Sequence, residues 1–236
     1  PMAGLGQRFR AVGELLPKPL IDVDGEPMFR KALSSLARAG VTGEVTAVIR
    51  AELQRDHGLG TALVEALPGL TVVELPAPTG GAAETVLAAR LDPDRPLLGM
   101  DCDIAFESDG YASAIVRAAA GAADGVLLSF RSTDPRYSFA ETDREGRVVR
   151  TAEKVAISEN ALMGVYFFSR AGDFVRAAEE VVASARASET PESYLSLVYN
   201  RLLERGATIA LATGTFYCFG TPEELEAYRE THLPVG

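Results

Sequence analysis

The chain has 236 residues, an apolar fraction of 47% and a formal net charge of −10. This length suits one sizeable α/β domain, and the apolar fraction is that of a globular protein. No apolar run is long enough to cross a bilayer, and the acidic balance argues against nucleic acid as a partner, which requires a basic face. Two cysteines make no disulfide framework, so we expect a reducing, cytoplasmic compartment.

A glycine-rich turn stands at the start of the chain. Gly4 and Gly6 have no Cβ, so the backbone N–H groups of this turn can close around an anionic oxygen. Arg8 adds a planar fork that can grip phosphate, and Lys18 is flanked by two prolines that stiffen its backbone. The turn over Ala3, Gly4, Leu5 and Gly6, with Arg8 and Lys18 as nearby cations, therefore suits a phosphate group, although a glycine turn alone is weak evidence for one.

Two common phosphate loops are excluded at this turn. The dinucleotide fingerprint requires a third glycine where Phe9 stands, and the Walker pattern requires Gly-Lys-Ser/Thr after the loop. Because a glycine turn of this kind usually follows a buried strand, we expect a few apolar residues to precede Pro1 in the natural protein.

Strands and helices alternate along the first half of the chain. Periodicity and capping signals predict helices over 27–38, 60–67, 81–91, 108–120, 171–187 and 191–205, with a last helix from Thr221. Apolar runs predict strands over 45–49, 70–75, 96–100, 125–130, 137–142, 147–153, 165–168, 208–211 and 216–219. Such alternation favours parallel strands with right-handed crossovers.

These elements predict an α/β fold: one Rossmann-like domain over 1–236, with a mostly parallel mixed sheet flanked by helices. We expect residues of about 1–130 to form a nucleotide-binding half, and residues of about 131–236 to form an acceptor-binding half.

Asp101 and Asp103 follow the apolar run 96–100. Ligands bind at the carboxyl ends of strands in open α/β sheets, and Mg²⁺ is often held by one or two carboxylates plus substrate phosphates. The pair therefore indicates a metal site, although a solvated loop or a capping role for Asp103 stays open. Cys102 has no histidine base in its sequence context, and His57 and His232 are expected at the surface.

Taken together, the motifs resemble those of the sugar-1-phosphate nucleotidyltransferases. AGLGQRF…LPKPLIDVDGEPMF is similar to their N-terminal G-x-G-x-R…P-K-P signature, and the resemblance extends over nearly the whole chain. Further similar strings follow in family order: PTGGAAETVL at 78–87, GMDCDIAF at 99–106, TAEK at 151–154, ALMGVYFFS at 161–169 and FGTPEEL at 219–225. The lead-in resembles especially the short bacterial cytidylyltransferase-like members.

The resemblance implies a GT-A-like fold and roles for particular residues. Asp103 is implied as the main ligand of Mg²⁺ or Mn²⁺, with Asp101 as its neighbour. The family often holds a second ligand, an aspartate, where this chain has Cys218, and a thiol is a poor substitute for that hard ligand.

The same resemblance assigns residues to the acceptor. Glu153 and Lys154 match a motif whose lysine approaches the acceptor phosphate, so Arg8, Lys18 and Lys154 are the implied catalytic cations. Gly164 would permit close approach of the sugar, and a β-bulge is the alternative explanation of this glycine.

The activity implied is transfer of a nucleotidyl group from a nucleoside triphosphate to a phosphorylated small molecule such as a sugar-1-phosphate, with release of pyrophosphate. Leu75 stands where thymidylyltransferase-like members hold a pyrimidine-reading glutamine, so the backbone of Thr79, Gly80 and Gly81, just before a helix, is expected to read the base. Pyrimidines are favoured, CTP first.

Two alternatives remain at this point. A metal-dependent GT-A glycosyltransferase would use the two aspartates on a nucleotide-sugar, and a nucleotide-sensing module would bind without catalysis. A homo-oligomer is compatible with the sequence.

Overall fold

A computed structural model describes residues 1–4, 6–188 and 192–232. The chain forms two compact units. Unit 1 comprises Pro1–Pro78, Asp101–Glu107 and Phe216–Gly236, and unit 2 comprises Thr79–Met100 and Ser108–Thr215. Both units are assembled from separate segments, so neither coincides with the contiguous halves 1–130 and 131–236, and the functional roles of those halves stay a prediction.

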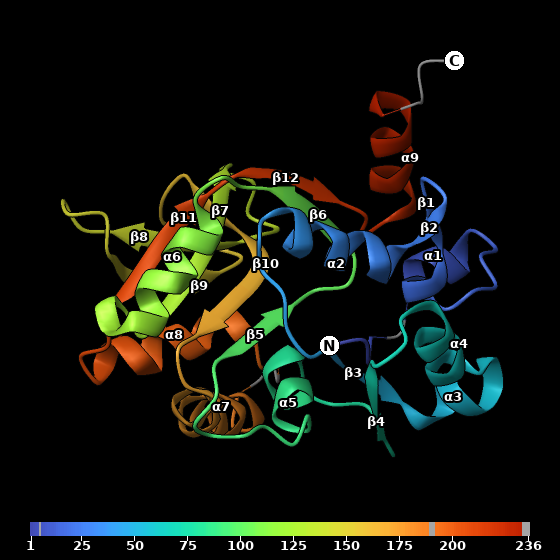
Figure 1. The fold of residues 1–236 in the computed structure, drawn as a ribbon, viewed down its shortest axis with the longest axis horizontal. Coiled ribbons are helices and arrows are strands. Elements are labelled where there is room, and N and C mark those ends of the chain that lie inside the picture. Colours follow the sequence, from blue (N-terminus) through green and yellow to red (C-terminus); the bar gives the residue numbers. More distant parts are fainter. Residues whose placement is uncertain (5, 189–191, 233–236) are drawn as a thin grey trace. The chain divides into compact units, whose positions relative to one another are not determined.

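Unit 1 holds most of the N-terminal elements and the C-terminal helix (Figure 1). Its helices are α1 (Gln7–Ala11), the 3-10 turn η1 (Lys18–Leu20), α2 (Met28–Arg38), α3 (Ala51–His57), α4 (Leu59–Ala66) and α9 (Pro222–Thr231). Its strands are β1 (Asp22–Val23), β2 (Glu26–Pro27), β3 (Thr46–Arg50), β4 (Thr71–Leu75), β6 (Ile104–Glu107) and β12 (Thr215–Cys218), the last without its first residue.

Strands β3 and β4 run parallel, with Arg50 opposite Leu75 at their carboxyl ends. Ala47 and Ile49 of β3 pack with residues of α2, α3 and α4 into one apolar cluster, as the period of two in a strand requires. The N-terminal segment lies beside β3, because the Met2 N–H donates to the Val48 carbonyl at 2.9 Å. The glycine turn therefore starts from a position fixed by the core of unit 1.

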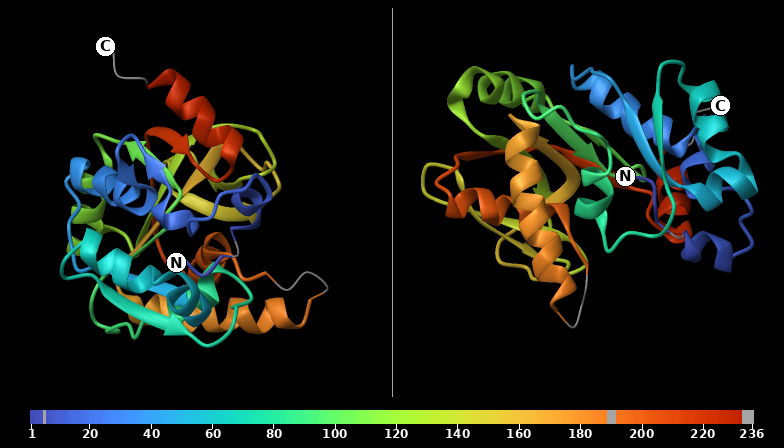
Figure 2. Two further views of the ribbon diagram at one scale, coloured as in Figure 1. Left: turned by 90° about the vertical axis from the view of Figure 1, so that its right-hand side faces the viewer. Right: turned by 90° about the horizontal axis from the view of Figure 1, so that it is seen from below.

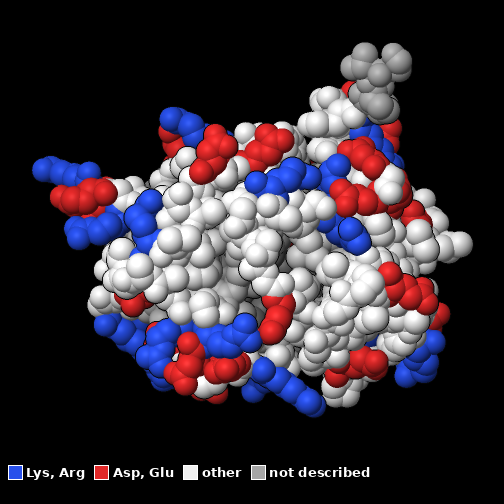
Figure 3. All heavy atoms as spheres, in the orientation of Figure 1, with Lys and Arg blue, Asp and Glu red and all other residues white. Residues whose placement is uncertain are grey.

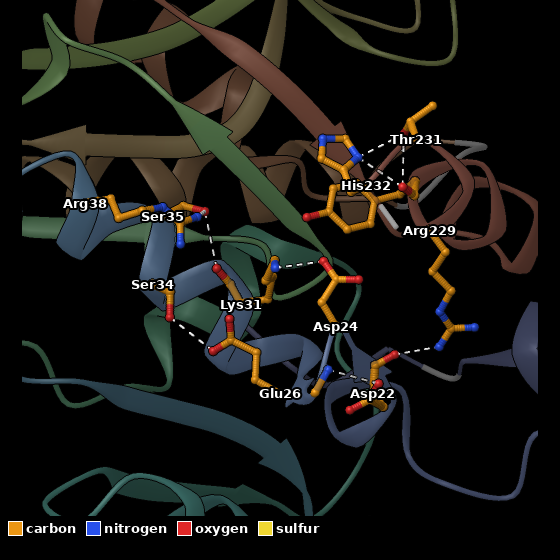
Figure 4. A network of polar contacts seen from close by, with 12 residues as sticks. Asp22, Asp24, Glu26, Lys31, Ser34, Ser35, Arg38, Arg229, Thr231 and His232 are labelled. Atoms are coloured by element: carbon orange, nitrogen blue, oxygen red, sulfur yellow. Dashed lines mark hydrogen bonds and ion pairs between the residues drawn. The ribbon is translucent and has the colours of Figure 1, made fainter. Parts of the chain in front are cut away.

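The C-terminal helix α9 is tied to the β1–β2 hairpin and to α2 (Figure 4). Arg229 donates to the Asp22 carbonyl at 2.7 Å, and Lys31 of α2 pairs with Asp24 of the hairpin turn at 3.0 Å. The helix begins at a cap in which Thr221 Oγ1 accepts from the Glu224 N–H at 3.2 Å. The cap fixes the start of α9 at Thr221, and the Arg229 contact holds the helix against the hairpin.

Unit 2 is a sheet with helices packed on it (Figures 1 and 2). Its strands are β5 (Leu97–Met100), β7 (Gly125–Arg131), β8 (Ser138–Thr142), β9 (Val148–Glu153), β10 (Asn160–Phe168) and β11 (Ile209–Thr213). Its helices are α5 (Ala82–Leu87), α6 (Tyr111–Arg117), the short π-helical turn η2 (Ala118–Ala122), α7 (Ala171–Arg186) and α8 (Leu195–Glu204). Helices α5, α7 and α8 share one apolar cluster with the strands.

The predicted mixed sheet flanked by helices is confirmed, but its mostly parallel character does not extend to unit 2. The strand order there is β11-β7-β10-β8-β9, with β5 also paired to β10. Strand β10 is antiparallel to β5, β7 and β8, and β8 is antiparallel to β9, whereas β11 is parallel to β7. The antiparallel pairs were missed because β10 has nine residues and pairs with three strands, whereas the sequence predicted a strand only over its last part, 165–168.

Other elements lie near their predicted positions, with shifted ends. Helices α1 and α3, the β1–β2 hairpin and strand β6 were not predicted. The start of the helix expected over 191–205 falls partly outside the described residues, and α8 itself begins at Leu195. Among the described residues, no helix combines the length and apolarity that crossing a membrane would need. Acidic and basic side chains are interspersed over the face shown in Figure 3.

Candidate active site

Lys18 is the centre of the polar contacts in unit 1. Its ammonium donates to Asp103 Oδ2 at 2.5 Å and to the Gly220 carbonyl at 3.1 Å, so one side chain links segments from three parts of the chain. Its backbone is set by Pro17, whose φ of −55° and ψ of 134° lead into η1. The structure thus brings together the predicted cation Lys18 and the predicted metal ligand Asp103.

The surroundings keep Lys18 charged. Burial of the side chain opposes the charge, but the nearby Asp103 carboxylate, by its charge and its hydrogen bond, raises the pKa of Lys18 above its usual value. The ammonium also lies 5.6 Å from the centre of the Phe9 ring, within the range of a cation–π contact. Lys18 therefore carries its positive charge at neutral pH.

The glycine turn lies next to Lys18. Gly6 has a φ of +62°, which glycine adopts at little cost, and a Cβ on it would lie 3.8 Å from the Lys18 Cβ. A small pocket is lined in part by Gly4, Gly6, Arg10 and Lys18. Ala3 precedes the turn in an irregular segment, and Leu5 lies outside the described residues.

The predicted cation Arg8 and Arg10 of the same helix are both exposed, and Arg10 also lines the pocket. The sequence did not indicate that Arg10 lines a pocket, because helix α1, which places it there, was not predicted. The role of Arg8 stays a prediction.

The predicted metal ligand Asp103 lies near Gly220, Cys218 and Glu224. A Cβ placed on Gly220 would lie 3.0 Å from Glu224 Oε2, 3.3 Å from Cys218 Sγ and 3.6 Å from Asp103 Oδ2. Carboxylate oxygens of Asp103 and Glu224 thus lie close together around Gly220, where a side chain would be crowded. This donor chemistry fits Mg²⁺, which takes oxygen ligands from one or two carboxylates and from substrate phosphates.

Cys218 has the properties of a packed thiol. Its Sγ lies 3.2 Å from Glu224 Oε2, to which it donates. Burial, followed by the negative charges of Asp103 and Glu224, raises the pKa of Cys218 to about 12. A protonated thiol is a poor ligand for Mg²⁺, and Glu224 is a second carboxylate that lies near Gly220. Glu224 was missed because its place in FGTPEEL, three residues after the helix-capping Thr221, is typical of a capping box.

We expect Cys218→Ser to leave the affinity for Mg²⁺ almost unchanged, because the thiol is not a hard ligand. Titration calorimetry with Mg²⁺ in the presence of CTP measures this, and Cys102→Ala is the matched control. A large loss of Mg²⁺ affinity in Cys218→Ser alone would contradict the assignment.

The raised pKa of Cys218 gives a second readout in the Cys102→Ala protein. Thiolate is the reactive form, so the alkylation rate with iodoacetamide should be low at pH 8 and still rise about tenfold per pH unit up to pH 10. An ordinary thiol, with a pKa of about 8.5, would instead level off in this range.

In unit 2, the predicted turn Thr79–Gly80–Gly81 is held by Ser193. The Ser193 N–H donates to the Gly80 carbonyl at 2.7 Å, and the Ala83 N–H donates to the Ser193 carbonyl at 2.9 Å. The Gly80 N–H donates to the Glu84 carboxylate of α5 at 2.5 Å. Thr79 shares a 2.6 Å hydrogen bond with the Thr85 hydroxyl. The Gly80 amide is thus occupied within the protein, and base reading by this turn stays a prediction.

Gly81→Ala should destabilise the protein by about 2–4 kcal/mol, as expected for strain plus a steric clash. Gly81 has a φ of +142°, and a Cβ there would lie 2.5 Å from both the nitrogen and the oxygen of Ser193. Urea unfolding measures the change. Gly146→Ala is the control, because its φ is +79° but nothing lies within 4 Å of the added Cβ. Equal destabilisation by both variants would show that the Ser193 contact is unimportant.

The predicted acceptor residues Glu153 and Lys154 stand at the end of β9. Ser138 and Ser196 donate to Glu153 Oε2 at 2.5 and 2.7 Å. Burial raises the pKa of Glu153, and these two hydroxyls oppose the rise. Lys154 adopts a φ of +57°, which is uncommon without glycine, and its ammonium donates to the Tyr194 hydroxyl at 2.6 Å.

The segment 193–196 therefore connects two predicted motifs of unit 2. Ser193 binds the turn at Gly80, Tyr194 binds Lys154, and Ser196 binds Glu153. Sequence reasoning missed this segment, because no motif marks it and its partners lie 40 or more residues away. Gly164 has a φ of +81° at a register irregularity of β10 between Leu162 and Tyr166, which agrees with the β-bulge alternative. Its predicted contact with the sugar is untested.

Comparison with known proteins identifies similar sequences and folds. The model of the family described as MobA-like NTP transferase domain matches residues 2–148. No curated protein matches the sequence. The nucleoside-diphosphate-sugar pyrophosphorylase from Vibrio cholerae RC9 is similar in structure, with a TM-score of 0.80 and 23% identity over 98% of each chain.

Two further solved structures are similar. A putative glucose-1-phosphate thymidylyltransferase from Bacillus anthracis, in complex with a sucrose, has a TM-score of 0.75 and 18% identity, over 100% of this chain and 94% of that one. The apo form of a UDP-glucose pyrophosphorylase has a TM-score of 0.71 and 15% identity, over 98% and 95% of the two chains. These similarities confirm the predicted fold class.

Proposed function

Because the chain belongs to the family of MobA-like NTP transferase domains and is a nucleotidyltransferase, we propose that it transfers a cytidylyl group from CTP to a phosphorylated small molecule. A sugar-1-phosphate is the first candidate for this acceptor, and pyrophosphate is the second product. The family match favours nucleotidyl transfer over the glycosyltransferase and nucleotide-sensing alternatives.

The contact of Lys18 with Asp103 and Gly220, beside the glycine turn, is the observation that carries this proposal. An oxygen of the acceptor phosphate attacks the α-phosphorus, and the bond from that phosphorus to the bridging oxygen breaks. Pyrophosphate leaves with the electron pair. Lys18 and Arg8 balance the charge of the triphosphate, and the rigid mount of Lys18 means that little reorganisation is needed.

Asp103 and Glu224 are the residues that would hold Mg²⁺ or Mn²⁺, with Asp101 close by in sequence. When bound, this ion neutralises triphosphate charge and orients the phosphates. Lys154 is proposed to bind the acceptor phosphate. Tyr194 and Glu192 now hold its ammonium, at 2.6 Å and 3.6 Å, so the acceptor would displace these contacts.

A matrix of nucleotides against acceptors tests the proposal. Purified protein is incubated with CTP, UTP, dTTP, ATP or GTP and with sugar-1-phosphates, phosphocholine or phosphonates, and pyrophosphate release is measured. We expect pyrimidine nucleotides to exceed purines clearly in kcat/KM, with CTP first. A preference for ATP or GTP would contradict the pyrimidine assignment, and release without any acceptor would contradict the transfer. A cytoplasmic location and homo-oligomerisation stay predictions.

A further inference from the structure

Arg50 is a buried cation with unused donors. It ends strand β3 and is 3% exposed. Nη1 donates to the Glu52 carboxylate at 2.7 Å, whereas Nε and Nη2 have no hydrogen-bond partner in the part of the chain that the structure describes. Buried polar groups are almost always hydrogen-bonded, and leaving a charged donor unsatisfied is especially costly. Two donors on one edge of the guanidinium therefore lack a partner, and a ligand would reach them only after neighbouring side chains move, because both atoms are fully buried.

The position of Arg50 is that of a ligand-binding residue. It stands at the carboxyl end of a parallel strand, where open α/β sheets bind their ligands. In the β3–β4 strand pair Arg50 lies opposite Leu75. By the resemblance described above, Leu75 is the position of the glutamine that binds the pyrimidine in thymidylyltransferase-like enzymes. Three residues further along the chain, Leu53 lines the same pocket as Gly4 and Lys18.

The side chain of Arg50 does not belong to the apolar core of unit 1. Ala47 and Ile49 of the same strand pack into that core with residues of α2, α3 and α4. Successive side chains of a strand point to opposite faces, so Arg50 leaves β3 on the face opposite Ile49. Packing in this core therefore does not explain why a guanidinium is buried there.

We propose that Arg50 reads the base of the bound nucleoside triphosphate, with Nε and Nη2 donating to the O2 and N3 atoms of cytosine. This inference rests on the proposed function and deepens it, because Leu75 has no polar group with which to read a base. A guanidinium offers donors in a fixed fork and no acceptor, so it matches two adjacent acceptors on a planar ligand.

This chemistry separates cytosine from the other pyrimidines. In uracil and thymine N3 carries a hydrogen, so one donor of Arg50 would face another donor. Adenine presents one acceptor beside one amino donor on its pairing edge. Guanine has two adjacent acceptors in O6 and N7, so GTP is the competitor that tests whether the pocket is shaped for a pyrimidine.

Binding measurements on the whole protein test the proposal without relying on turnover. Titration calorimetry with CTP, UTP, GTP and inorganic tripolyphosphate, each with Mg²⁺, is performed on wild type, Arg50→Met and Arg50→Lys. Arg55→Gln is the matched control, because that arginine is on neighbouring α3 with its side chain 72% exposed, and it pairs with Asp56. Thermal unfolding of each variant reports the fold, and Arg50→Lys retains the charge if Arg50→Met does not fold.

We expect wild type to bind CTP at least about 100-fold more tightly than UTP, since unpaired polar groups discriminate strongly. Arg50→Met and Arg50→Lys should weaken CTP binding by about 5–150-fold, the range of one bidentate base contact, and lower the ratio of CTP affinity to UTP affinity by at least the same factor. Tripolyphosphate binding should remain unchanged, and Arg55→Gln should behave like wild type.

Several results would overturn the inference. If both Arg50 variants keep the wild-type ratio of CTP affinity to UTP affinity, another group reads the base. If the wild type binds GTP more tightly than CTP, the cytosine assignment is wrong. Wild type that binds tripolyphosphate but distinguishes no base also rejects the role of Arg50, while leaving nucleotidyl transfer intact. Wild type that binds neither tripolyphosphate nor any nucleotide rejects the proposed function itself.

Discussion

Replacing Lys18 with alanine is expected to lower kcat/KM for nucleotidyl transfer by at least ~10²-fold, which corresponds to about 2.7 kcal/mol of transition-state stabilisation. The ammonium is held by Asp103 and by the Gly220 carbonyl before any substrate arrives. Its charge is therefore positioned in advance, which is the condition for a large electrostatic contribution. Steady-state kinetics of pyrophosphate release with CTP and the best acceptor measure the effect.

Lys31→Ala is the matched control for this variant. Lys31 belongs to the same unit and pairs with Asp24 at 3.0 Å, so its removal also leaves an unpaired aspartate. It should change stability slightly and kcat/KM little. Near-normal turnover in Lys18→Ala, or equal losses in the two variants, would reject the assigned role of Lys18.

Asp103→Asn is the second variant from which a loss of at least ~10²-fold in kcat/KM is expected. The change removes a carboxylate ligand from the proposed metal site and leaves the Lys18 ammonium without its counter-charge beside that site, and both effects weaken metal binding. The Kd of Mg²⁺ should therefore rise as turnover falls. Asp101→Asn should have the smaller effect, because Asp103 contacts Lys18 and lies near Gly220 and Glu224.

The control for Asp103→Asn is Asp24→Asn, which neutralises the carboxylate of the Lys31 pair and should leave Mg²⁺ binding unchanged. Asparagine tolerates the φ of +54° found at Asp24, so this control adds little backbone strain. Full activity of the wild type in excess EDTA would contradict metal dependence. Similar losses in Asp101→Asn and Asp103→Asn would contradict only their ranking.

The sequence was most informative where a local pattern determines the structure. The helix of α2 and the capped start of α9 at Thr221 follow from periodicity and capping, and both are present. The β1–β2 hairpin escaped prediction because two-residue strands carry no periodicity, although Asp24-Gly25 is a turn signal. Helix α1 was not predicted, because it has only five residues and directly follows the glycine turn.

The polar contacts of the candidate site could be predicted less well. Lys18 and Asp103 were singled out separately, but their pairing joins residues 85 positions apart and depends on tertiary structure. Arg50 drew no attention, because an arginine that ends a strand looks like an exposed residue until its burial is known. Glu224 matched a capping pattern so well that its orientation toward Gly220 could not be foreseen.

The division of the chain into units also has a consequence for protein engineering. Residues 108–215 form one uninterrupted insertion into unit 1, and the strands that flank it, β6 and β12, pair with each other. The two ends of the insertion are therefore held side by side by a strand pair that belongs almost entirely to unit 1. Strand β5 and helix α5 of unit 2 lie outside this insertion, and both contribute to the sheet or core of that unit. An exchange of unit 2 therefore requires both of its segments, 79–100 and 108–215, and would leave Lys18, Asp103 and Gly220 in place.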